Sequence, residues 1–139
     1  MGGYLAALYA AEHPETDRLA LLAPAFGFAT RWPDLLGAEK LQAWKETGQM
    51  EVFHYGDNAN RQLSYGLYED ALRYPANPDF HQPAEIFHGV QDDVVPVSFS
   101  RQFTAEHPNV SLHEFESGHE LLNVLDQITA AATRFLTAE

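Results

Sequence analysis

Short aliphatic runs alternate with amphipathic segments along the chain, and this alternation predicts its secondary structure. Nearly continuous aliphatic runs, which are typical of strands buried on both faces of a parallel sheet, lie at 18–23, 85–87 and 110–115. Apolar residues recur at helical spacing over 3–13, 97–106 and 121–135. This order predicts right-handed β-α-β crossovers, and therefore an α/β fold with a three-stranded parallel sheet and flanking helices.

The stretch from about residue 27 to about residue 80 differs from the rest of the chain because turn signals and aromatic residues are dense there. We interpret it as a small cap-like insertion after the first strand. Within it the pattern predicts helices near 39–47 and 67–74 and a hairpin formed by 51–55 and 61–65. Its aromatic side chains either anchor the insertion by packing or line a substrate pocket, and the sequence leaves both interpretations open.

Composition and charge exclude several classes of function. The 139 residues carry 8 Lys and Arg against 20 Asp and Glu, and this net charge of −12 repels nucleic acids and anionic membrane surfaces. The absence of cysteine excludes thiolate nucleophiles and Cys-type zinc sites. The sequence has neither a secretory signal pattern nor an apolar run of about 20 residues that could span a membrane, so we expect a cytoplasmic protein.

Two polar residues lie just beyond the ends of neighbouring predicted strands. Asp92 lies after the second strand, and His119 lies after the third. The carboxyl ends of parallel strands meet at one edge of the sheet, so Asp92 is expected beside Nδ1 of His119, where it would fix the tautomer of the imidazole. Such a pair activates a hydroxyl nucleophile. His81 and His88 match no common zinc spacing, and no metal or cofactor is expected.

The motifs around these two residues resemble the C-terminal half of an α/β-hydrolase, the superfamily of esterases, lipases and thioesterases. The family's acid loop, G-x-x-D-x-x-V-P, is matched by residues 89–96, with Asp92 at the acid position and Asp93 as the fallback acid. The family's histidine comes directly after a glycine beyond the last strand, as in Gly118-His119. The resemblance runs through residues 1–139 and implies a partial α/β-hydrolase fold whose substrate is a small ester or thioester.

The first residues resemble the segment directly after the nucleophile in the family's G-x-S-x-G turn, where Met1-Gly2-Gly3 would succeed the serine. The resemblance implies that Met1 supplies an oxyanion-hole amide and that Phe26 and Phe28 lie at the substrate cleft. It also implies that the serine precedes this chain. We therefore expect a truncated serine hydrolase that is inactive as given.

Other interpretations stay open beside this one. None of the five serines stands between a strand and a helix with glycine on both sides, so none is assigned as the nucleophile. One alternative is an interaction module that forms a homo-oligomer through the exposed edge of the first strand, residues 18–23. Another is a non-catalytic, ligand-binding descendant of the fold that keeps the cleft and has discarded the serine.

Overall fold

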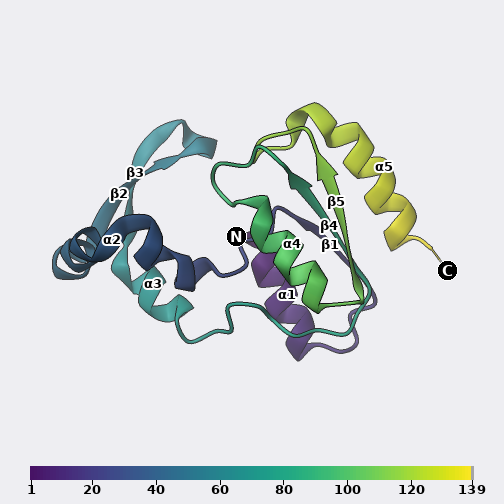
Figure 1. Cartoon of the computed structure of the whole chain (residues 1–139), viewed down its shortest axis with the longest axis horizontal. Coiled ribbons are helices and arrows are strands. Elements are labelled where there is room, and N and C mark those ends of the chain that lie inside the picture. Colours follow the sequence, from purple (N-terminus) through teal and green to yellow (C-terminus); the bar gives the residue numbers. More distant parts are fainter. Residues whose placement is uncertain (139) are drawn as a thin grey trace. The chain divides into compact units, whose positions relative to one another are not determined.

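The chain folds into two compact units. The structure, a computed structural model, describes residues 1–138. A sheet unit comprises Met1–Phe26 and the chain from Asn77 onward, and a hairpin unit comprises Gly27–Ala76. Figure 1 labels the helices and strands of both units.

The sheet unit is built on three parallel strands in the order β1-β4-β5, as the aliphatic runs predicted. The strands are β1 (Leu19–Leu22), β4 (Ala84–Gly89) and β5 (Val110–Phe115). In the register, Leu21 of β1 pairs with Ile86 of β4, which pairs with Leu112 of β5. The helical segments of this unit are α1 (Gly2–Glu12), α4 (Val97–Glu106), η2 (Leu122–Val124) and α5 (Leu125–Leu136).

The two faces of the sheet are covered by different helices. Successive side chains of a strand point to opposite faces. Phe87 of β4 therefore packs on one face, in a cluster with Val124 and Ile128. Val124 directly precedes α5, and Ile128 lies within this helix. Its neighbour His88 points to the other face, where it reaches α4. Figure 1 shows α1 and α4 on the same side of the sheet and α5 on the opposite side.

The hairpin unit is a helix, an antiparallel hairpin and a second helix. Its elements are α2 (Phe28–Thr47), β2 (Gln49–His54), η1 (Tyr55–Asp57), β3 (Ala59–Ser64) and α3 (Tyr65–Ala71). The predicted hairpin is confirmed. Its first strand begins two residues earlier than predicted, at Gln49, and its second strand begins two residues earlier, at Ala59. The first helix begins far earlier than predicted, because α2 continues across a kink at Gly37, whose φ of 75° interrupts the helical geometry.

The aromatic residues of this unit pack against one another. Trp44 is 2% exposed, and its indole N–H donates to the carbonyl oxygen of Leu63, 3.0 Å away. The rings of Trp32, Tyr65 and Tyr68 lie 5.2, 5.3 and 5.8 Å from the Trp44 ring. A small unit needs such an apolar anchor, so the structure favours packing as the role of these residues.

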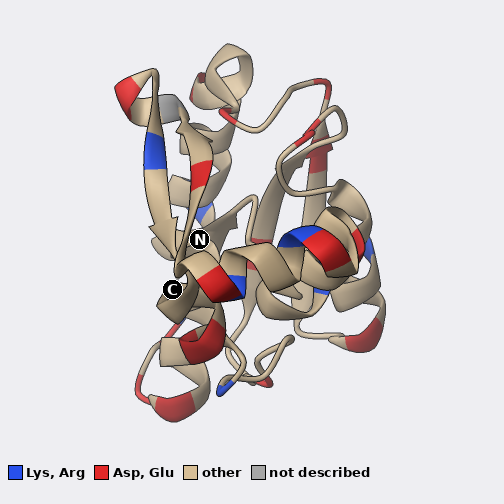
Figure 2. Ribbon diagram, turned by 90° about the vertical axis from the view of Figure 1, so that its left-hand side faces the viewer, with Lys and Arg blue, Asp and Glu red and all other residues tan. Residues whose placement is uncertain are grey.

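Acidic residues lie on many elements of the chain and outnumber the Lys and Arg residues, 20 against 8 (Figure 2). Across residues 1–138, no helix combines the length and the apolar character that crossing a membrane requires.

Candidate active site

The loop after β4 holds the carboxylate of Asp92 in a buried position. The side chain is fully buried, and its Oδ1 accepts hydrogen bonds from the backbone N–H groups of Val94 (2.9 Å) and Val95 (2.7 Å). An ionised carboxylate away from water is stable only when donors surround it. The two backbone N–H groups supply such donors and fix the orientation of the carboxylate plane.

The other carboxylate oxygen of Asp92 meets His119. Oδ2 lies 2.8 Å from Nδ1 of His119, a contact that joins residues 27 apart in sequence. An ionised carboxylate only accepts hydrogen bonds, so Nδ1 carries the proton and Nε2 has its lone pair available. The imidazole is 33% exposed, so it remains accessible from solvent. A buried acceptor behind a partly exposed imidazole is the arrangement of a general base and its orienting acid.

The geometry distinguishes between the two adjacent aspartates of the motif. Asp92 contacts His119, whereas the neighbouring Asp93 is exposed. The motif register favours Asp92 as the acid, and the structure places this residue against the histidine.

The loop that presents His119 is fixed to the acid loop by close backbone contacts. The N–H of Gln91 donates to the carbonyl oxygen of Ser117, 3.0 Å away. The two segments approach so closely that a Cβ atom at Gly89 would lie 2.2 Å from the same Ser117 oxygen. A side-chain contact adds to this attachment, because the Gln91 amide donates to Oε2 of Glu116 at 3.2 Å. Within the histidine loop, the Ser117 hydroxyl donates to Asn123 Oδ1. The two polar loops therefore behave as one structural element.

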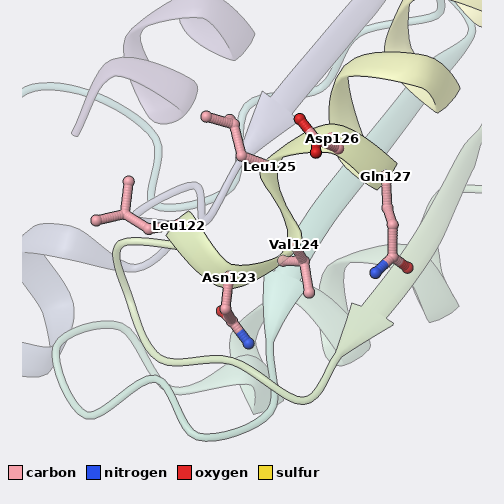
Figure 3. A pocket seen from close by; sticks show the side chains of 6 residues that line it. All are labelled: Leu122, Asn123, Val124, Leu125, Asp126 and Gln127. Atoms are coloured by element: carbon pink, nitrogen blue, oxygen red, sulfur yellow. The ribbon is translucent and has the colours of Figure 1, made fainter.

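A pocket of about 410 Å³ is lined by residues just beyond this loop, Leu122–Gln127 (Figure 3). The Leu122 side chain is 68% exposed and that of Leu125 is 49% exposed, and Figure 3 shows both extending in the same direction from the backbone. The sequence analysis missed this feature, because it assigned 121–135 to one continuous helix. Leu121 instead has a left-handed φ of 57°, and η2 precedes α5.

The remaining predicted site residues lie at three different places. Met1 precedes α1 and is 41% exposed, and its carbonyl oxygen accepts a hydrogen bond from the N–H of Leu5. Phe26 is fully buried in the sheet unit, where its ring stacks on that of Phe103 at 3.9 Å. Phe28 begins α2 of the hairpin unit and meets the Trp32 ring edge to face. Their functional roles stay predictions.

None of the five serines donates a hydrogen bond to His119 in the described part of the chain. Ser100 is fully buried and bonds to Nδ1 of His88, and Ser117 bonds to Asn123. Ser64 caps the N-terminus of α3. The other two, Ser98 and Ser111, are exposed.

The contact of His88 with the site was not predicted from the sequence, where this histidine was considered only as a metal ligand and rejected. Its Nε2 lies 2.8 Å from the carbonyl oxygen of Val95 and 3.2 Å from Oδ2 of Asp92. The spacing of four residues between His88 and Asp92 was visible in the sequence, but the return of the loop that joins them was not.

The described residues contain no cluster of three or more His, Asp or Glu side chains arranged to hold a metal ion.

Solved structures of hydrolases share the fold of almost the whole chain. Alpha/beta hydrolase domain-containing protein 10 from mouse is 19% identical with a TM-score of 0.79, and the match covers 99% of this chain and 59% of that one. A putative hydrolase from Agrobacterium vitis is 22% identical with a TM-score of 0.81, over 96% and 57% of the two chains. Est1E from Butyrivibrio proteoclasticus is 25% identical with a TM-score of 0.72, over 96% and 56%.

The present chain thus spans 56–59% of the length of these three proteins. No curated protein sequence matches it. The model of one family, described as Uncharacterised protein family (UPF0227), matches residues 1–136. The chain has the fold of the α/β-hydrolases and belongs to the uncharacterised protein family UPF0227.

Proposed function

We propose that the protein to which this chain belongs is a serine hydrolase acting on a small ester or thioester. The observation that carries this proposal is the contact of 2.8 Å between Oδ2 of Asp92 and Nδ1 of His119. One partner is fully buried and bound by backbone donors, and the other is a third exposed. This combination suits a base that must exchange protons with a substrate.

The reaction is set by the roles of these two side chains. Nε2 of His119 takes the proton of a serine hydroxyl as the oxygen attacks the carbonyl carbon, and Asp92 stabilises the imidazolium that results. The imidazolium then donates its proton to the leaving alcohol or thiol, which leaves an acyl-enzyme. Water then attacks the acyl carbon as its proton passes to Nε2 of His119. The bond to the serine oxygen breaks, the imidazolium returns the proton to that oxygen, and the carboxylic acid is released.

The nucleophile is proposed to lie outside residues 1–139. No serine of the described chain reaches His119, and the chain spans only 56–59% of three hydrolases that share its fold. We place the serine directly before Met1, whose backbone amide would then help to bind the oxyanion. Without a triad nucleophile, kcat falls by on the order of a million-fold, so the present chain alone should be nearly inert.

The pocket beside the histidine loop limits the size of the substrate group that could lie there. It begins three positions after His119, and its lining combines Leu122, Val124 and Leu125 with the polar residues Asn123, Asp126 and Gln127. Its volume of about 410 Å³ suits a small acyl or alcohol group.

The net charge of −12 makes nucleic acids and anionic membranes unfavourable partners, and we place the protein in the cytoplasm.

The outer edge of β1 is the proposed site of a further strand. In the described sheet β1 is an edge strand, and a groove of about 490 Å³ beside it is lined mainly by apolar residues of α1, β1 and α5. An apolar strand edge is a template for pairing. In the longer protein we expect a strand of the additional segment at this edge, and in the isolated chain we expect a second copy.

The function is tested by assaying a short p-nitrophenyl ester and an acyl thioester with the 139-residue chain and with a form extended by the upstream coding sequence. We expect hydrolysis by the extended form only, and its loss when the serine before Met1 is replaced by alanine. Equal activity of the short form would show that the nucleophile is assigned wrongly. An extended form that hydrolyses neither substrate class would refute the proposed function. Analytical ultracentrifugation of the 139-residue chain tests whether it self-associates through the edge of β1. A monomer would contradict the proposed self-association.

A further inference from the structure

His88 lies on the inner side of the proposed catalytic pair. Its side chain and that of Asp92 are both fully buried. Nε2 of His88 lies 2.8 Å from the carbonyl oxygen of Val95, in hydrogen-bonding geometry, and 3.2 Å from Oδ2 of Asp92. Both neighbours are acceptors, so a proton must reside on Nε2. Without that proton, three electron-rich atoms would face one another in a buried site.

The other ring nitrogen of His88 is held by α4. Nδ1 lies 2.8 Å from the hydroxyl oxygen of Ser100, which is itself fully buried. With Nε2 protonated, neutral imidazole accepts at Nδ1, so the Ser100 hydroxyl donates to it. The hydroxyl of Thr104 donates to the Ser100 carbonyl oxygen one turn earlier, which anchors this part of the helix. A hydroxyl can donate or accept, so the Ser100 contact accommodates this tautomer, and the two acceptors of the acid loop are what require the proton on Nε2.

Val95 connects His88 with Oδ1 of Asp92. The N–H of Val95 donates to Oδ1 of Asp92 at 2.7 Å, while its carbonyl oxygen accepts from His88. His88 thus acts on the carboxylate in two ways: through the Val95 backbone that holds Oδ1, and by the direct approach of Nε2 to Oδ2. This second oxygen is also the one that contacts His119.

We propose that His88 is a positioning residue for the Asp92–His119 pair, with its Nε2 proton donated to the Val95 carbonyl oxygen and its partial positive charge held against Oδ2 of Asp92. The carboxylate plane is then fixed on both sides, and His119 keeps its proton on Nδ1. The role rests on the proposed function, because it matters for catalysis only if Asp92 and His119 are the acid and the base. Its structural content is tested without any substrate.

The first test is nitrogen-15 NMR of the histidine rings in the 139-residue chain at neutral pH. In the unmodified chain we expect His88 as the Nε2–H tautomer and His119 as the Nδ1–H tautomer. An unprotonated Nε2 on His88 would overturn the proposal, and this measurement requires no variant.

Three variants separate positioning from packing. His88→Gln keeps an amide donor near the position of Nε2, and we expect His119 to remain Nδ1–H. His88→Asn keeps only an acceptor toward Ser100, and His119 should shift toward a mixture of both tautomers. Ser100→Ala is the matched control, because it removes a buried hydrogen bond of His88 and leaves the Nε2 proton in place.

The proposal is wrong if His88→Asn leaves the tautomer of His119 unchanged, or if Ser100→Ala alters it equally. If His88→Asn does not fold, His88→Gln still tests the proposal. Loss of the Nδ1–H form of His119 in a folded His88→Gln variant would contradict it.

A kinetic measurement in the extended protein keeps this inference distinct from the proposed function. There His88→Asn should lower kcat about tenfold, the equivalent of one hydrogen bond, with KM unchanged and with recovery in His88→Gln. If the extended protein hydrolyses no ester while the NMR pattern holds, the function fails and the role of His88 stands. If hydrolysis is observed and His88→Asn has the unmodified kcat, the role of His88 fails and the function stands.

Discussion

A Cβ atom on Gly89 would lie 2.2 Å from the carbonyl oxygen of Ser117 and 2.6 Å from that of Gly118. The end of β4 is therefore in contact with the backbone of the loop that presents His119. Only a residue without a side chain permits this approach, because both colliding atoms belong to the backbone and cannot rotate away. The absence of a side chain at Gly89, in the acid motif, therefore allows the loop that carries His119 to lie against the end of β4.

Gly89→Ala should consequently displace the His119 loop. We expect the free energy of unfolding to fall by about 1–3 kcal/mol, as is typical of overpacking, and the contact between Asp92 and His119 to lengthen. Urea unfolding measures the first effect, and the Nδ1–H signal of His119 reports the second. Gly118→Ala is the matched control, since a Cβ atom there meets nothing within 4 Å. Equal losses in both variants would refute this account of Gly89.

Asp92→Asn tests the acid in the extended protein. The amide that replaces Oδ2 can turn a donor toward Nδ1 of His119, which would favour the tautomer that cannot accept the serine proton. We expect kcat to fall by on the order of 10⁴-fold, as for a triad acid replaced by its amide.

Asp93→Asn is the control for this variant, because it removes the same charge from an exposed neighbour. Its kcat should stay within about twofold of the unmodified value, since the hydrogen bond to His119 comes from Asp92 and the neighbouring Asp93 side chain is exposed. A large loss in Asp93→Asn with a small one in Asp92→Asn would move the acid role to Asp93.

The sequence predicted much of this arrangement because the relevant signals are local. The strand predicted at 110–115 coincides with β5, although only Val110 of this strand is buried, and the helical spacing at 97–106 coincides with α4. Asp92 and His119 were expected to be close because both come after parallel strands, and adjacent parallel strands end at the same edge.

The contacts that the sequence could not predict depend on the path of the backbone. His88 contacts Asp92 only because the loop between them returns toward the strand end, which brings Val95 against the His88 ring. The first half of α2 was missed because Gly37 and Pro33 are normally helix-ending signals, whereas here the helix continues across a kink at Gly37. Neither feature has a periodic signature.

Phe103 of α4 lies between two other rings in the core of the sheet unit. Its ring is fully buried, and it stacks on Phe26 at 3.9 Å and on His107 at 3.8 Å. Phe103→Ala should therefore lower the free energy of unfolding by about 3–5 kcal/mol, through lost burial and a cavity that the stacked rings cannot fill. The measurement is urea unfolding, with Leu122→Ala as the control.

Leu122 is 68% exposed, so its truncation should change stability by no more than about 0.5 kcal/mol. A loss in Phe103→Ala as small as that of the control would contradict the stacked core.

The pair formed by Arg101 of α4 and Glu114 of β5 gives stability a defined dependence on pH. The guanidinium donates from Nε to Oε1 of Glu114 at 3.0 Å and from Nη2 to the other carboxylate oxygen. These hydrogen bonds hold the pKa of Glu114 below its ordinary value of 4.5, with the positive charge of Arg101 adding to the effect. A carboxylate whose pKa is lower in the folded state stabilises that state above the ordinary pKa, and the contribution disappears as the pH falls through the lowered value.

Arg101→Met should therefore reduce stability at neutral pH, and the difference from the unmodified chain should shrink to nothing in strongly acidic solution. Urea midpoints across this range measure it. Arg134→Met is the control, because it removes an equal charge from a residue of α5 for which the described structure records no carboxylate partner. The change in stability caused by Arg134→Met should not vary with pH over the range in which Glu114 is protonated. Because Glu114 titrates only in acid, a difference between Arg101→Met and the unmodified chain that has the same size at neutral and at the lowest pH would show that the ion pair contributes nothing to stability.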